Sequence, residues 1–155
     1  MLTLAELSAR HARDGQVEAI LLRPARRAEM VRVAAAEVSE AGLTGDRAGP
    51  GKRALTLIQA EHLPVIAALA GLDAVAPEAL RRNLVVSGLN LSGWRGRRLR
   101  LGTAELEITG PCAPCSRMEA ALGHGGYAAM RGHGGWCARV TRPGRVAEGG
   151  VVTPA

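Results

Sequence analysis

The sequence predicts a mainly β (α+β) fold, a mostly antiparallel sheet closed into a barrel with a few short helices at its ends. Short apolar or alternating runs recur between turn residues, helical runs are few, and the strand–helix alternation of a parallel sheet is missing. A chain of 155 residues with 47% hydrophobic residues and no compositional break has the length of one domain. We therefore expect a single domain over residues 1–155, with its core at about 17–152.

The chain opens with a short predicted helix within residues 1–14, because Thr3 followed by Glu6 has the spacing of a capping box. Beyond it, apolar or alternating runs are separated by turn residues such as Gly102, which is the pattern of strands. The predicted strands are, in order, Gln16–Leu22, Met30–Ala35, Ala54–Ile58, Leu84–Val86, Arg97–Leu101, Glu105–Thr109, Trp136–Thr141, Arg145–Val146 and Val151–Val152.

Three further helices interrupt the strands. Gln59–Ala70 is rich in Ala and Leu and stops at Gly71. Pro77–Arg82 begins with a proline, which is favoured in the first turn of a helix. Ser116–Leu122 is followed directly by a glycine. We place these helices at the ends of the barrel, because they are too few to cover a parallel sheet.

The net charge and the small number of aromatic residues limit the kinds of molecule that the chain is expected to bind. Of the 20 basic residues only Lys52 is a lysine, and the formal net charge is +6, which favours anionic ligands. The chain has no Phe, one Tyr and two Trp, too few rings for a stacking surface, so we expect no specific nucleic-acid binding. Three cysteines and an N-terminus unlike a signal peptide predict a cytoplasmic protein, and no apolar stretch has the length of a membrane span.

The segment Gly45–Arg53 is rich in glycine and resembles a phosphate loop. Arg53 stands where such a loop needs Ser or Thr to bind magnesium, so an ATPase or GTPase is not expected. Asp46 and Arg47 on this segment are candidate ligand-binding residues. The alternative interpretation is a solvated connection between two strands.

The segment Gly110–Arg117 carries the most suggestive chemistry, because Cys115 follows a strand and lies close to the start of a predicted helix, with Arg117 beside it. Such a thiol can serve as a nucleophile, a redox partner or a soft metal ligand. Alternatives are two small buried residues near a turn, or a thioredoxin-like dithiol with Cys112, which lacks the expected strand–helix context. A structural zinc site could draw on Cys112, Cys115, His124, His133 and Cys137, although their spacings match no common finger.

Two further segments carry candidate residues. Gly123–Tyr127 recurs nine residues later as Gly132–Trp136, with Arg131 between the copies, and His133 and Gly134 in the second copy could approach an anion. The alternative is a glycine-permitted reversal before a strand. Arg82 and Asn83 join a helix to a strand and could hold a phosphate and a ring edge, or Arg82 could simply complement the helix end.

In this order the segments resemble the MOSC domain, named for the C-terminal domain of molybdenum cofactor sulfurases. The resemblance runs from about Val17 to Val152, and its most specific pieces are Gly42–Arg47 and Arg82–Gly88. The other matching pieces are Gly15–Ile20 with Arg23 and Pro24, Arg53–Gln59, Pro111–Arg117, and Arg131–Val140 running to Gly150.

The resemblance implies a β-barrel that binds the molybdenum cofactor (Mo–molybdopterin) or handles its sulfur. Cys115 would be the catalytic cysteine, which ligates molybdenum or carries a persulfide; Cys112 would be a helper or resolving thiol, and Cys137 would pack within a strand. The implied cofactor-binding residues are Asp46, Arg47, Arg82, Asn83, Arg117, Arg131, His133 and Gly134.

The implied activity is that of a molybdenum-dependent oxidoreductase reducing N-hydroxylated compounds, or of a sulfur transferase. The alternatives are a sulfur-carrier or interaction module without its own turnover, and a structural zinc-binding domain. No pyridoxal phosphate site is expected, because Lys52 lies in a glycine-rich loop and no aminotransferase-like domain is present. The expected partners are the pterin-phosphate cofactor and a cysteine desulfurase or an electron-donor protein.

Overall fold

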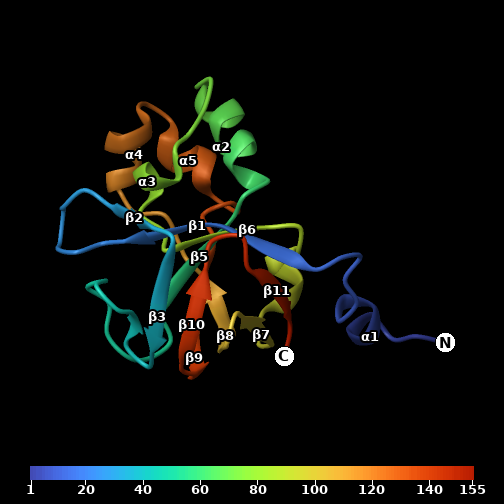
Figure 1. Ribbon diagram of the computed structural model, residues 1–155. Helices are drawn as coiled ribbons and strands as arrows, with labels where there is room; N and C mark the ends of the chain where they lie inside the picture. Colours follow the sequence, from blue (N-terminus) through green and yellow to red (C-terminus); the bar gives the residue numbers. More distant parts are fainter.

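Seven strands close into a barrel in the computed structural model, which describes residues 1–155 (Figure 1). The strands are β1 (Gly15–Leu22), β2 (Val31–Val33), β3 (Ala35–Ser39), β4 (Gly42–Leu43), β5 (Leu55–Gln59), β6 (Leu84–Ser87), β7 (Arg98–Leu101), β8 (Ala104–Pro111), β9 (Trp136–Arg142), β10 (Gly144–Ala147) and β11 (Val151–Pro154). The order around the barrel is β1, β11, β7, β8, β9, β5 and β6, and β2 extends the sheet beyond β1. The predicted mainly β barrel is confirmed.

The barrel closes because β11 pairs with both β7 and β1, with Gly15 opposite Val152 at the closing seam. Every pair in it is antiparallel except β5 and β6, where Leu57 lies opposite Leu84 in a parallel register. Parallel neighbours need a crossover connection, which two of the helices supply. The sheet is therefore mixed, a detail that the predicted antiparallel arrangement did not contain. A second sheet joins β10, β3 and β4.

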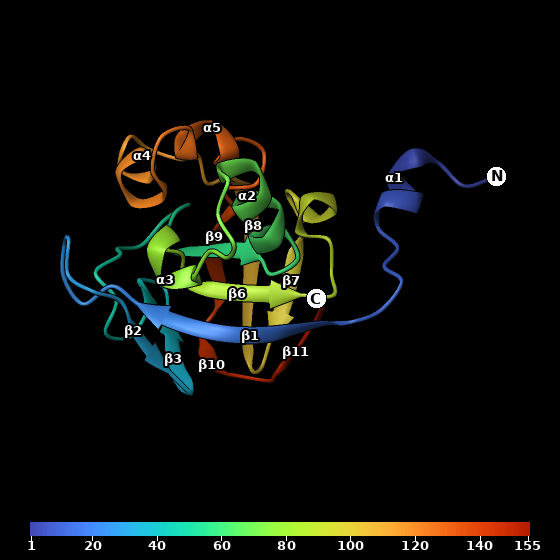
Figure 2. The ribbon, with the colours of Figure 1, turned by 90° about the horizontal axis from the view of Figure 1, so that it is seen from above.

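Four of the five α-helices lie together at one end of the barrel (Figures 1 and 2). The five are α1 (Leu4–Ser8), α2 (His62–Ala70), α3 (Pro77–Leu80), α4 (Arg117–Leu122) and α5 (Gly126–Met130), with a 3-10 turn η1 at Leu91–Trp94. Helices α2 to α5 lie on one side of β1 and β6, while α1 stands apart from the barrel (Figures 1 and 2). No helix has both the length and the apolar character needed to span a membrane.

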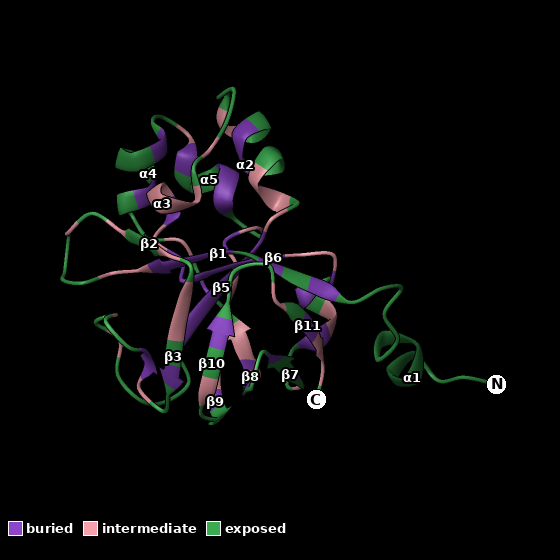
Figure 3. Ribbon diagram, in the orientation of Figure 1, coloured by how far each residue is buried: buried purple, intermediate pink, exposed green.

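Two hydrophobic cores hold this arrangement together (Figure 3). The larger cluster fills the barrel and includes Ile20 and Leu57, both fully buried. The smaller cluster lies outside the barrel wall, where Leu21 and Val85 pack under Met118 of α4 and its neighbouring helices. The second half of β1 is apolar on both faces, because the barrel core covers one face and the helices cover the other. The helical layer is thereby fixed against β1 and β6.

Several predicted elements differ in extent. The N-terminal helix has the predicted capping box but covers only Leu4–Ser8 and buries no residue. The helix predicted from Gln59 begins at His62, because Gln59 is still in β5. The one predicted to Arg82 ends at Leu80, because Arg81 adopts a left-handed conformation with φ of 59°.

Four short elements were not predicted. They are β3, β4, α5 and the 3-10 turn η1, each of five residues or fewer. The predicted strand Met30–Ala35 runs across the break between β2 and β3, which belong to different sheets. Such short segments carry too few residues for a periodic pattern, so tertiary contacts decide their structure.

Candidate functional site

Asp46 lies at the centre of a polar cluster at the end of β1. Its carboxylate is fully buried and forms a two-point ion pair with Arg23, with 2.9 Å between Nη2 and Oδ2. The backbone N–H groups of Arg23 and Ala48 also donate to it. Burial alone would raise the pKa of Asp46, but the hydrogen bonds and charge of Arg23 lower it below its usual value. Asp46 is therefore held as a carboxylate.

Asn83 connects this carboxylate to the barrel wall. It is fully buried, and its side-chain nitrogen donates to Asp46 and to the carbonyl of Leu21, both at 3.1 Å. Its side-chain oxygen accepts from the backbone and hydroxyl groups of Thr56. Since these bonds occupy the amide, Asn83 acts on a ligand through the residues that it positions.

Arg81 is the member of the cluster with a buried side-chain nitrogen that forms no hydrogen bond. One guanidinium nitrogen donates to the carbonyl of Ala28, while Nη2 is buried with no hydrogen-bond partner. Burial lowers the pKa of Arg81, and the positive charges of Arg23, Arg117 and Arg47 lower it further. Several guanidinium groups therefore crowd together here beside one buried carboxylate, which is an environment that favours an anionic ligand.

Arg82, although next in the chain, has a different role. It is buried, and its guanidinium donates to three carbonyl oxygens: Gly134 at 2.7 Å, Leu80 at 2.9 Å and Cys112 at 3.4 Å. These bonds join the end of α3 to the cysteine segment and to the glycine-rich segment. Arg82 thus holds the loops of the site in place.

Cys115 is exposed at the surface, two residues before α4. Its carbonyl accepts the N–H of Met118 at 2.9 Å, which fixes the turn into the helix. Arg117, the first residue of α4, is close enough to Arg81 for the two charges to repel. The structure therefore places the predicted reactive thiol just before the helix whose first residue extends the arginine cluster.

The remaining predicted residues gather around a separate cavity of about 320 Å³ under α2 and α5. Arg131 and Gly134 line it together with Cys112 and His62, whereas Cys115 does not. His133 stacks edge-on against His62 with ring centroids 5.2 Å apart, and its Nδ1 is buried without a partner. Burial lowers the pKa of His62, and His133 lowers it further.

The predicted site residues therefore fall into two groups. Asp46, Arg47 and Arg117 lie near Arg81, with Asn83 bonded to Asp46, while Arg131, His133 and Gly134 adjoin the cavity, and Arg82 joins the two. Sequence reasoning missed Arg23 and Arg81 as site residues. The Arg23–Pro24 turn and the Arg81–Arg82 pair marked their positions, but no pattern showed that Arg23 pairs with Asp46 or that the charge of Arg81 lies near it.

The predicted alternative of a structural zinc site is wrong. No three His, Cys, Asp or Glu side chains come close enough together to hold a metal ion. Cys115 and His124 are exposed, whereas Cys112 and Cys137 are buried in the barrel wall. The five proposed ligands thus point to different places, and a closed tetrahedral site cannot form.

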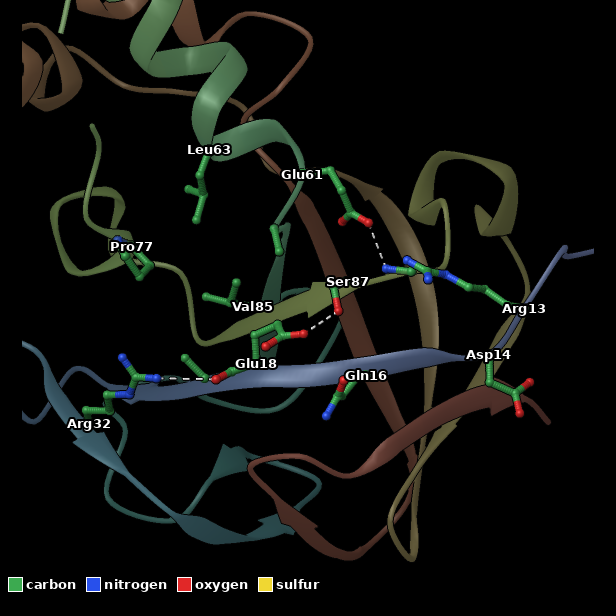
Figure 4. Close-up of a pocket in the computed structure, with 13 residues that line it drawn as sticks. Arg13, Asp14, Gln16, Glu18, Arg32, Glu61, Leu63, Pro77, Val85 and Ser87 are labelled. Carbon is green, nitrogen blue, oxygen red and sulfur yellow. Dashed lines mark hydrogen bonds between the residues drawn. The ribbon is translucent and has the colours of Figure 1, made fainter. Parts of the chain in front are cut away.

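The largest cavity, of about 690 Å³, lies elsewhere, on the outer face of β1 and β6 (Figure 4). None of the predicted site residues lines it. Several of its polar groups already have partners, since Ser87 donates to Glu18 and the N–H of Gly88 donates to Glu61. Arg32 at its rim binds Glu148 and the carbonyl of Glu18. Much of the polar lining of this groove is therefore paired within the chain.

Fold and site together define a small β-barrel with a cluster of arginines and an exposed cysteine just before α4. The family model of the MOSC domain matches residues 44–153, so the chain belongs to the MOSC domain family. No curated protein matches the chain.

Solved structures share this fold. The YuaD protein of Bacillus subtilis is 20% identical with a TM-score of 0.80, covering 90% of this chain and 94% of that one. YiiM of Geobacillus stearothermophilus is 19% identical with a TM-score of 0.74, covering 91% and 75%. YiiM of Escherichia coli is 24% identical with a TM-score of 0.71, covering 90% and 69%.

Proposed function

We propose that this chain binds the molybdenum cofactor, with the metal at Cys115 and the pterin phosphate at the arginine cluster. The observation that carries the proposal is the guanidinium of Arg81, which has a buried, unpartnered Nη2 and three other arginines around it. A phosphate supplies the hydrogen-bond acceptors and the negative charge that this cluster lacks. The membership of the MOSC family supports the same ligand class.

Each residue of the cluster has a part in this proposal. Arg81, Arg47 and Arg117 are assigned direct contact with the phosphate, since the charges of Arg47 and Arg117 are near enough to Arg81 to lower its pKa. Asp46 fixes Arg23 and is itself fixed by Asn83, so these two are positioning residues. Arg82 positions the cysteine segment from the other side.

Cys115 supplies the soft sulfur ligand. Its thiol is exposed and can meet a metal at the surface without breaking a buried contact. When bound, the molybdenum cofactor supplies two-electron redox chemistry, and we assign to it the reduction of N-hydroxylated compounds with electrons from a partner protein. Arg131, His133 and Gly134 are proposed as a second contact, on the cavity side of the cysteine segment. We propose a cytoplasmic location, because all three cysteines are free thiols.

Metal and pterin analysis of protein from a cofactor-producing host tests the proposal. We expect molybdenum and pterin with the wild type, and at least a tenfold loss of both with Arg81→Gln and Arg117→Gln. Cys115→Ala should lose molybdenum and keep pterin, because the phosphate contacts remain. Arg139→Gln, on the far wall of the barrel beside Glu107, is the matched control and should bind as the wild type does. A wild type free of both molybdenum and pterin overturns the proposal.

The second candidate is a sulfur carrier, favoured by the exposure of Cys115 to a protein partner. After incubation with a cysteine desulfurase and cysteine, intact mass should rise by one sulfur atom, and Cys115→Ala should abolish the rise. Because this measurement needs no cofactor, a positive result without molybdenum or pterin identifies the carrier. An unchanged mass on the wild type excludes it.

A further inference from the structure

Two buried thiols that the proposed function does not use lie side by side in the barrel wall. Cys112 is 7% exposed and Cys137 is 4% exposed. Cys137 on β9 lies opposite Gly110 of β8, and the N–H of Cys112 donates to the carbonyl of Gly135 at 2.8 Å. The two cysteines are therefore diagonal neighbours across an antiparallel pair, and their side chains hydrogen-bond to each other.

Two arginines border this pair. The guanidinium of Arg53 hydrogen-bonds to the thiol of Cys137 and also reaches Cys112. The Arg53 segment is held against the pair by Thr109, whose hydroxyl lies 2.6 Å from the carbonyl of Lys52 and 3.1 Å from that of Cys137. Arg82 is the second arginine at the pair, and its guanidinium donates to the carbonyl of Cys112. Positive charge on two sides stabilises a thiolate within the pair.

The pair shares its protons unequally. The hydrogen bond from Cys112 lowers the pKa of Cys137, and although burial opposes this, Arg53 lowers that pKa further. The same hydrogen bond and burial raise the pKa of Cys112. Cys112 is thus the thiol that keeps its proton, and Cys137 is the thiolate that accepts the hydrogen bond from it.

Only one of the two cysteines lines a cavity. Cys112 lines the cavity of about 320 Å³ that His62 and Arg131 also line, whereas Cys137 does not. The register between β8 and β9 shifts between Ile108 and Gly110, so the strand leaves its regular ladder just before Cys112. A strand end of this kind can adjust when its side chain forms a bond.

We propose that Cys112 and Cys137 are a redox-active dithiol, which a small peroxide entering the cavity oxidises to a disulfide independently of Cys115. The Cys137 thiolate acts as the base, taking the proton of Cys112 while the Cys112 sulfur attacks the peroxide and breaks the O–O bond. Cys112 becomes a sulfenic acid, and the hydroxide released takes the proton back from Cys137 to form water. The Cys137 thiolate then attacks the sulfenic sulfur, the S–S bond forms, and hydroxide leaves and is protonated. The dithiol loses two electrons, and peroxide is reduced to two waters.

Mass spectrometry of the full chain treated with hydrogen peroxide tests the proposal. The reduced protein should lose two hydrogen atoms without gaining oxygen. After alkylation and trypsin digestion, peptide Leu101–Arg117 should be linked to peptide Gly132–Arg139. Fragment ions should place the link at Cys112 and the alkyl group on Cys115. A link through Cys115, or oxygen added to Cys115 while the buried pair stays reduced, overturns the proposal.

Variants separate the roles of the groups. Cys115→Ser should keep the link, while Cys137→Ser should leave a sulfenic acid on Cys112 that a dimedone probe captures. Arg53→Gln should slow oxidation at least threefold, because the thiolate loses its nearest positive charge. Lys52→Gln removes the same charge one residue away and should oxidise at the wild-type rate. Equal rates for Arg53→Gln and the wild type contradict the part assigned to Arg53.

Discussion

At the scale of single residues, the sequence motifs of the site divide into side chains that hold the structure and side chains that are free to bind. Asp46 and Asn83 belong to the first kind, because their oxygens and nitrogens are occupied within the protein. Arg81 belongs to the second, since one of its nitrogens is buried without a partner. A linear motif shows which residue types occur together. It does not show which of their side chains already have hydrogen-bond partners within the protein.

Asp46→Asn is expected to lower the free energy of unfolding by about 2–4 kcal/mol at neutral pH, because Arg23 loses its charged partner in a buried position. The pKa of Asp46 is lowered in the folded protein, so its contribution is present above the unfolded pKa of about 3.9 and is lost as the pH falls through the folded pKa. Urea unfolding at neutral and at acidic pH should show the difference between variant and wild type shrinking below about pH 4.

The control for this prediction is Asp73→Asn, which neutralises an exposed carboxylate. Its unfolding free energy should stay within about 0.5 kcal/mol of the wild type. A cost for Asp46→Asn that is the same at both pH values would falsify the link to ionisation.

At the scale of elements, the segment Gly132–Gly135 shows how a glycine-rich pattern can have two causes. The sequence suggested backbone that approaches an anion. In the structure, Gly135 has φ of 94° and its Cα faces β5 so closely that a Cβ would overlap the carbonyl of Leu57. Gly134 similarly faces the carbonyl of Cys112. These two glycines are required by the crossing of neighbouring backbones, and Gly132 by its positive φ alone.

Gly135→Ala is therefore expected to cost about 2–4 kcal/mol of unfolding free energy, because strain at positive φ adds to overlap with β5. Gly132→Ala is the matched variant, with φ of 82° and nothing within 4 Å of the new Cβ, and should cost about 1 kcal/mol. Chemical denaturation of both proteins measures the two costs. Equal losses of unfolding free energy would show that overlap with β5 adds nothing to the strain at positive φ.

The elements that could be predicted are those with enough residues to carry a pattern. β1 and β9 were found because seven or eight residues of strand-forming type lie between turns. The helix α5 was missed because its five residues follow two glycines, and its position depends on contacts with α2 and α4. The site was predicted only in part for the same reason, since the bonds of Asp46 to Arg23 and Asn83 depend on the register of three distant segments.

At the scale of the whole molecule, the arginines divide into those that pair with glutamates and those that have no carboxylate to balance them. On the outer wall of β7 to β10, arginines face glutamates across the strands, as in the pairs Arg100–Glu105 and Arg139–Glu107. Such exposed pairs contribute little stability, but they leave that wall without strong net charge. Around Arg81 the arginines outnumber the carboxylates. The part of the +6 net charge that bears on ligand binding is therefore the group of arginines around Arg81, near the Cys115 segment, where carboxylates do not balance the positive charges.

The barrel that carries this site depends on its last strand. β11 closes the seam between β7 and β1, with Val152 fully buried in the main core opposite Gly15, while its neighbour Val151 is 55% exposed. Val152→Asp should lower the unfolding free energy by more than about 3 kcal/mol, because an unpaired carboxylate enters the core at the seam. Val151→Asp adds the same charge on the outer face and should cost less than about 1 kcal/mol.

Thermal unfolding combined with amide hydrogen exchange checks this prediction. If β11 is the closing element, Val152→Asp should first expose the amides of β1 and β7, including Val17, whose N–H donates to the carbonyl of Gly150 at 2.9 Å. The amides of β5 and β9, on the opposite wall, should exchange later. Equal losses of stability in the two variants, or uniform exchange around the barrel, would mean that closure by β11 does not control its stability. The proposed phosphate site lies at the helical end of the β1 and β6 wall, so opening the seam should also weaken the proposed binding at Arg81, although Val152 is not one of the residues assigned to the ligand.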